Sequence, residues 1–194
     1  MNYPQFWKEA SLRRKRIYSV IFVLILSIIA TLVGMLVPLS PQEAQLIVDQ
    51  LNRTVTENTA QGTLIPAIFI NNFSLCLLMF IPLIGLAIGL FILFSTGMAF
   101  RAIFDAQAAS GLSGATTQIE ASTAILALAL IGVVFLLEYV SYSIGMTESI
   151  WLFRRLLQNR WKGELKYLAI FIGIVALLLI VGAIVETYTL SLGL

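Results

Sequence analysis

The sequence predicts an all-α fold, a polytopic transmembrane helical bundle of about five spans with short amphipathic interfacial helices. Apolar residues make up 59% of the chain and charged residues 11%, against about 25% charged residues in soluble proteins. A soluble domain of this size would leave much of that apolar surface in water. The apolar residues also form long blocks, and a helix needs roughly 20 such residues to cross a bilayer.

The first apolar block, residues 17–39, follows a basic N-terminal segment. It is longer than the apolar core of a cleavable signal, about 7–15 residues, so we expect a retained span. Residues 41–53 come next, and they have apolar positions at helical spacing. Pro41 and the acidic Glu43 are typical of a helix start. We expect an external amphipathic helix that lies on the membrane surface or caps the bundle.

Residues 64–104 are apolar almost throughout and carry a single charge, Arg101. One straight helix of that length would measure about 60 Å, twice the hydrocarbon thickness of about 30 Å. We therefore expect a break near residues 82–85, where proline removes a backbone donor and glycine adds freedom. The block then supplies two spans, 64–81 and 83–104, although a re-entrant hairpin is an open alternative.

The last two blocks, residues 122–144 and 168–190, are each long enough for one span. The segment 105–121 before them contains glycine and small polar residues, which predicts a flexible external loop. Residues 146–167 mix tryptophan with arginine and lysine, which is typical of a cytoplasmic interfacial helix on anionic lipid. Because these aromatic residues adjoin membrane spans, we expect lipid and no nucleic acid as the partner.

Charge bias gives the number of crossings. Basic residues concentrate in segments 1–16 and 146–167, so both belong in the cytoplasm. The two segments share a side only if an even number of spans separates them, which requires two crossings within 64–104. We therefore expect a single membrane domain, 1–194, in the plasma membrane, with its C-terminus outside the cell.

Polar side chains within the spans are the candidate functional groups, because they are costly in lipid and usually face protein. The candidate intramembrane polar cluster consists of Asn71, Asn72, Arg101, Glu138 and Glu186. By depth, an ion pair between Arg101 and Glu186 near the outer face is one hypothesis. Glu138 lies about 24 Å from the outer start of its predicted helix, so we expect it nearer the inner leaflet and out of reach of Arg101.

These groups have two candidate roles. They satisfy one another and fix helix packing, or they conduct protons or ions through the carboxylates. The sequence contains no histidine, which removes the commonest general base and metal ligand. It also lacks a GxSxG, HExxH or phosphate-loop motif. We therefore predict no enzyme, no catalytic residue, and no metal or cofactor site.

Small residues form one face of the predicted third span. Gly85 and Gly89 are four residues apart, and Gly97 follows them along the same apolar stretch. Small residues let helix backbones approach closely, which matters because lipid gives no hydrophobic drive to helix association. We expect Gly85, Gly89 and Gly97 to be helix-packing positions and this span to be central in the bundle.

A family resemblance covers about residues 60–190. It rests on the segment 68–73, which contains both asparagines, on the glycines that follow it, and on the segment 183–186, which ends in a glutamate. These features resemble the stage II sporulation protein M family of small polytopic membrane proteins. Thr96-Gly97 departs from that family's Asn-Gly pair, and Glu138 lacks the His-Gly pair that often precedes it.

The resemblance implies a non-enzymatic scaffold or assembly subunit that works beside partners in the membrane. In that interpretation Asn71, Asn72, Glu138 and Glu186 belong to a shared packing core. Expected partners are membrane lipid and other membrane proteins or further copies of the chain. The alternative is a small transporter or channel that uses the intramembrane carboxylates.

Overall fold

The computed structural model describes residues 5–109 and 121–192, and nearly all of them are helical. The elements, in chain order, are α1 (Gln5–Glu9), α2 (Leu12–Met35), α3 (Pro41–Ala60), α4 (Leu64–Met79), α5 (Gly85–Ala109), α6 (Ala121–Leu157), the short 3-10 helix η1 (Trp161–Gly163) and α7 (Leu165–Ser191). The predicted all-α bundle is therefore present.

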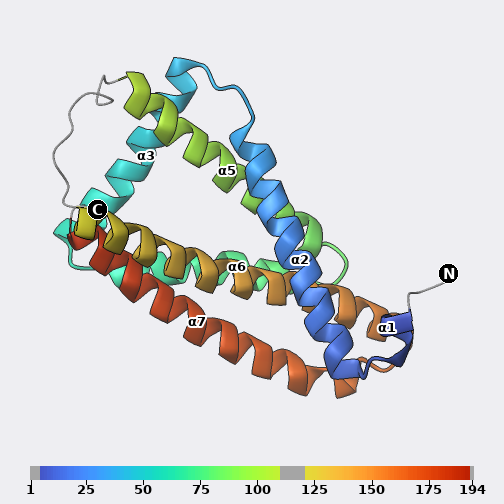
Figure 1. Cartoon of the computed structure of the whole chain (residues 1–194). Coiled ribbons are helices and arrows are strands. Elements are labelled where there is room, and N and C mark those ends of the chain that lie inside the picture. Colours follow the sequence, from blue (N-terminus) through green and yellow to red (C-terminus); the bar gives the residue numbers. More distant parts are fainter. Residues whose placement is uncertain (1–4, 110–120, 193–194) are drawn as a thin grey trace.

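The helices form two groups that meet at an angle (Figure 1). Helices α4, α6 and α7 pack together as one group, and α2 packs along α5 as the other. Helix α3 returns from the far end of α2 to the start of α4, and it packs on α5 on its way. The N-terminus and the turn between α6 and α7 lie at one end of the bundle, and the C-terminus lies at the opposite end of α7.

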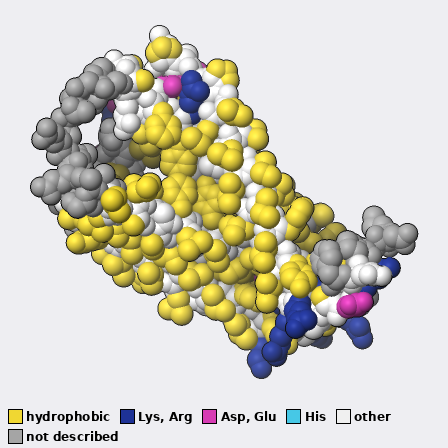
Figure 2. Space-filling model, in the orientation of Figure 1, with side chains coloured by type: hydrophobic (Ala, Val, Ile, Leu, Met, Phe, Trp, Pro, Cys, Tyr) yellow, Lys and Arg dark blue, Asp and Glu magenta, His cyan; other side chains and the backbone are white. Residues whose placement is uncertain are grey.

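Among the described residues, four helical segments are long and apolar enough to cross a membrane: Leu12–Met35, Gly85–Ala109, Leu128–Leu157 and Trp161–Ser191. The apolar α4 occupies the place of the remaining predicted span, but it has 16 residues. At the helical rise it measures about 24 Å, less than the hydrocarbon core of about 30 Å. Side chains on the body of the molecule are largely apolar, and basic side chains gather at the end near the N-terminus (Figure 2).

The turn that divides the long apolar block lies at residues 80–84, at the predicted position. Helix α4 ends before it and α5 begins after Pro82, with Leu83 in the left-handed region at φ 74°. A bulky residue rarely adopts this conformation, so the surrounding contacts must hold the turn in place.

The predicted external helix is longer than residues 41–53, because α3 continues to Ala60. Its start is a capping box in which the Ser40 hydroxyl accepts from the Glu43 backbone and the Ser40 backbone donates to Glu43 Oε2 at 2.8 Å. Hydrogen bonds from the Ser40 side chain and backbone hold the pKa of Glu43 below its usual value. Ala44 is the buried residue of this helix, and α3 packs mainly on α5.

Two expected connections differ in the structure. The basic segment 146–167 is not a separate interfacial helix, because α6 continues without a break to Leu157 and residues 141–149 are all buried. Small side chains there pack against α4 and α5. This packing keeps the segment in α6, although the basic and aromatic residues that follow are typical of an interfacial helix. The first part of the predicted loop 105–121 is also helical, since α5 extends to Ala109, and residues 110–120 lie outside the described residues.

Glycines allow the closest helix contacts. At the crossing of α2 and α5, a Cβ on Gly97 would fall on the Thr31 carbonyl, and a Cβ on Gly34 would fall on the Phe94 carbonyl. Gly85 lies against the Met79 carbonyl in the same way, and Gly89 lies against the side chain of Met146. All three predicted packing glycines are therefore buried at helix contacts, although the most continuously buried stretch belongs to α6 and not to α5.

We predict that Gly97→Ala destabilises the protein by about 1–3 kcal/mol, because the added methyl group forces α2 and α5 apart. The matched control is Gly173→Ala in α7, where a Cβ meets nothing within 4 Å. That change should leave stability unchanged or raise it slightly through helix propensity. Thermal unfolding in detergent measures both variants, and equal midpoints would contradict the close α2–α5 contact.

Candidate functional site

A polar cluster joins α4, α6 and α7 within the apolar part of the bundle. The Asn72 amide donates to Glu138 Oε1 at 2.6 Å, and the Asn71 amide donates to the Asn72 side-chain oxygen at 3.2 Å. Glu186 of α7 is near enough to Glu138 to interact with it electrostatically. Four of the five predicted polar residues therefore come together, and we call Asn71, Asn72, Glu138 and Glu186 the carboxylate cluster.

Arg101 is not part of this cluster, and the expected ion pair with Glu186 is wrong. Arg101 Nε instead lies 2.7 Å from Asp105 Oδ2, one turn further along α5. Helix α5 packs on α2, α3, α4 and α6, and its C-terminal half leads away from α7 (Figure 1). Similar depth in two spans does not bring side chains together when the helices cross at an angle.

Glu138 lies apart from the Arg101–Asp105 pair, as expected, but it is not set apart from the other polar residues, because it accepts a hydrogen bond from Asn72. Helix α6 has 37 residues and measures about 55 Å, so it extends well beyond one membrane thickness. Glu138 lies about 25 Å from the start of this helix, near its middle. At this point of α6, Glu138 lies level with Asn72 of the shorter α4, which donates to it.

A buried polar stretch follows on α6, from residue 141 to residue 149. Ser141 donates to the Leu137 carbonyl at 2.7 Å, and the Cys76 thiol of α4 donates to the Ser141 carbonyl at 3.5 Å. Within the described part of the chain, the hydroxyls of Ser143 and Thr147 and one oxygen of Glu148 have no hydrogen-bond partner. Polar groups thus continue along α6 from the carboxylate cluster toward the end of the bundle near the N-terminus.

Arg16 of α2 joins three helices at that end of the bundle. It pairs with Glu164 and, at 3.4 Å, with Glu148. Its guanidinium also lies over the rings of Trp151, Tyr167 and Phe171, at 5.2, 5.1 and 5.8 Å from their centroids. Cation–π contacts of this kind strengthen as water is removed, and Arg16 is largely buried.

Glu164 has a second partner, because Arg155 Nε lies 3.0 Å from its other oxygen. Arg16, Glu148, Arg155 and Glu164 therefore form a network of two positive and two negative charges. This network was not predicted from the sequence, because the basic side chains of residues 146–167 dominate the local pattern. The two acidic residues among them were the available signal, but their partner Arg16 stands far away in the chain.

A smaller contact ties α2, α5 and α6 together. The Thr31 hydroxyl lies 2.7 Å from the Tyr139 hydroxyl and 3.2 Å from the Leu93 carbonyl. No group of three His, Cys, Asp or Glu side chains within the described segments is arranged to hold a metal ion. Some of the buried polar groups thus connect one helix to another.

The fold and these buried polar contacts define a class, the all-α helical bundles with four apolar helices long enough to cross a membrane, which indicates a multi-pass membrane protein. No family model, curated protein or solved structure matches the chain.

We predict that Arg16→Gln is strongly destabilising, by about 3–5 kcal/mol, because it leaves Glu148 and Glu164 buried with too little positive charge. The control is Arg13→Gln, which removes an exposed charge from the same turn of α2 and should change stability by less than about 0.5 kcal/mol. Thermal unfolding and size-exclusion profiles in detergent compare the two, and similar behaviour would show that the network is dispensable.

Proposed function

We propose that the chain is a plasma-membrane protein that acts as a non-enzymatic scaffold or assembly subunit of a membrane complex. The observation that carries this proposal is the use of buried polar groups as ties between helices. Asn72 and Glu138 join α4 to α6, Thr31 and Tyr139 join α2 to α6, and Arg16 joins α2 to α6 and to the start of α7. Polar pairs of this kind fix helix packing in lipid.

The resemblance to the stage II sporulation protein M family supports the same proposal. Asn71, Asn72 and Glu186 of the carboxylate cluster are among the residues on which that resemblance rests. Partners would then bind within the membrane, through the apolar side chains that the bundle exposes along its length. Other membrane proteins or further copies of the chain fit such a surface, with lipid covering the rest.

The proposed topology has five spans, with the N-terminus in the cytoplasm and the C-terminus outside. It counts α4 as a crossing helix, because a short helix can be accommodated by local thinning of the bilayer. Four crossings then separate the N-terminal basic segment from the basic α6–α7 connection, which keeps both on the cytoplasmic side.

Single-cysteine labelling tests this topology in a Cys76→Ala background. With an impermeant maleimide on intact cells, we expect Thr56→Cys in α3 to react and Lys162→Cys in η1 to react only after permeabilisation. Both positions are exposed in the structure. If Lys162→Cys reacts on intact cells while Thr56→Cys also reacts, α4 does not cross and the five-span topology is wrong.

A second candidate function is a small proton or ion transporter. The observation that favours it is the run of polar groups from Glu138 and Glu186 along α6 to Glu148, which includes the unpaired hydroxyls of Ser143 and Thr147. Intramembrane carboxylates with polar neighbours are the usual components of proton relays. Such a relay would need water between the carboxylate cluster and Glu148.

Two measurements on Glu138→Gln separate these functions. A scaffold should crosslink to the same partners in repeated membrane preparations, and the substitution should lower its stability or its yield of crosslinked complex. A transporter should give pH-dependent flux in proteoliposomes that Glu138→Gln abolishes while the fold persists. Flux with no reproducible crosslink would overturn the scaffold proposal. Glu57→Gln, the same substitution at an exposed carboxylate of α3 outside the cluster, is the control and should change neither measurement by more than about twofold.

A further inference from the structure

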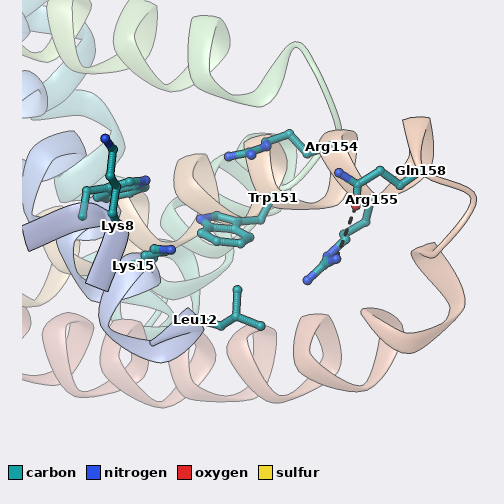
Figure 3. A pocket seen from close by; sticks show the side chains of 8 residues that line it. Lys8, Leu12, Lys15, Trp151, Arg154, Arg155 and Gln158 are labelled. Carbon is teal, nitrogen blue, oxygen red and sulfur yellow. Dashed lines mark hydrogen bonds between the residues drawn. The ribbon is translucent and has the colours of Figure 1, made fainter. Parts of the chain in front are cut away.

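A cavity of about 450 Å³ opens at the end of the bundle near the N-terminus. It lies between α1, the start of α2 and the last turns of α6, and Figure 3 shows the side chains around it. Its lining residues are Trp7, Lys8, Leu12, Lys15, Trp151, Arg154, Arg155 and Gln158. The cavity thus combines four basic groups with two tryptophans, and its lining has no acidic residue.

The basic groups of this cavity differ in their partners. Arg155 pairs with Glu164 and donates to Gln158 at 3.3 Å, so its charge is already compensated. Lys8, Lys15 and Arg154 have no carboxylate within ion-pair distance in the described part of the chain. Three positive charges therefore surround one cavity, and their mutual repulsion falls when an anion binds between them.

The walls of the cavity position these charges. Trp151 is buried, and the Arg154 guanidinium lies over its ring at 5.7 Å from the centroid. Figure 3 shows Lys15 beside Trp151, with Leu12 of the same helix below them. A tryptophan and an aliphatic side chain next to cations suit a ligand that has both an anionic group and an apolar part.

The position of the cavity along the bundle also indicates which class of ligand it can reach. The cavity lies where two apolar helices, α2 and α6, reach the end of their membrane-crossing length. Tryptophan is enriched at the headgroup level of a bilayer, and basic pockets between helices at the cytoplasmic surface bind anionic headgroups. Phosphate is the anionic group available at that depth.

We propose that this cavity is a binding site for the phosphate group of an anionic phospholipid. Lys15 and Arg154 contact the phosphate oxygens, Lys8 adds charge at the rim, and the acyl chains leave along Leu12 and the surface of α2. Arg154 is the main contact, because its planar guanidinium can donate two parallel hydrogen bonds to one phosphate. A free phosphate ion has the same chemistry and is the competing source. The proposal is independent of the scaffold function and of the number of spans.

Titration calorimetry of the full chain in maltoside micelles tests the site with dioctanoyl phosphatidylglycerol as the probe. We expect saturable binding that the double variant Lys15→Gln/Arg154→Gln weakens by roughly tenfold or more. The matched control is Arg160→Gln/Lys162→Gln, which removes two charges from the neighbouring α6–α7 connection outside the cavity and should stay within about threefold of wild type. Arg154→Lys keeps the charge but loses the paired donors. Its affinity for the lipid should therefore lie between that of the wild type and that of Lys15→Gln/Arg154→Gln.

Further measurements distinguish a phospholipid from free phosphate as the ligand, and some of their outcomes would overturn the proposal. Displacement of the lipid by millimolar inorganic phosphate assigns the site to phosphate alone, whereas no displacement assigns it to the phospholipid. Equal loss of affinity in both double variants shows general surface electrostatics and overturns the proposal. Equal binding of dioctanoyl phosphatidylcholine also overturns it, because a zwitterionic headgroup brings no net charge. Unfolding midpoints within a few degrees of wild type confirm that the variants are folded.

Discussion

Close packing of helix backbones is the constraint on which the rest of this structure depends. Lipid gives apolar helices no hydrophobic reason to associate, so contact must come from dispersion and polar ties. Gly34 and Gly97 bring α2 against α5, and Gly85 and Gly89 fit the start of α5 against α4 and α6. A methyl group at most of these positions would fall on a neighbouring backbone, so the crossing angles cannot change without separating the helices.

The crossing geometry then decides which polar groups meet. Because α4, α6 and α7 pack as one group, Asn72, Glu138 and Glu186 come together although they belong to three helices. Because α5 crosses that group obliquely, Arg101 is carried away from it and pairs with Asp105. The same packing closes α2 onto the last part of α6, where Arg16 reaches Glu148. The polar contacts follow from the packing and then stabilise it.

Local sequence patterns predicted much of the fold and little of the geometry of the polar site. Apolar block length predicted the long helices, the proline at 82 marked the turn, and Pro41 with Glu43 marked the start of α3. The partners of Glu138, Arg101 and Arg16 depend on helix crossing angles and on the full length of α6. Neither property can be predicted from the spacing of residues in the sequence. Depth counted from one helix end therefore did not predict the contact between Glu138 and Asn72.

At the end of the bundle near the N-terminus, the ion-pair network of Arg16, Glu148, Arg155 and Glu164 adjoins the basic cavity, and Arg155 belongs to both. Glu148 and Glu164 pair with Arg16 and Arg155, and neither carboxylate is among the residues that line the cavity. If they were free to turn outward, they would neutralise Arg154 or Lys15 and remove the site's preference for an anion. Trp151 belongs to both structures, since its ring contacts Arg16 and Arg154. The network that closes this end of the bundle therefore also keeps the adjoining cations available to a phosphate.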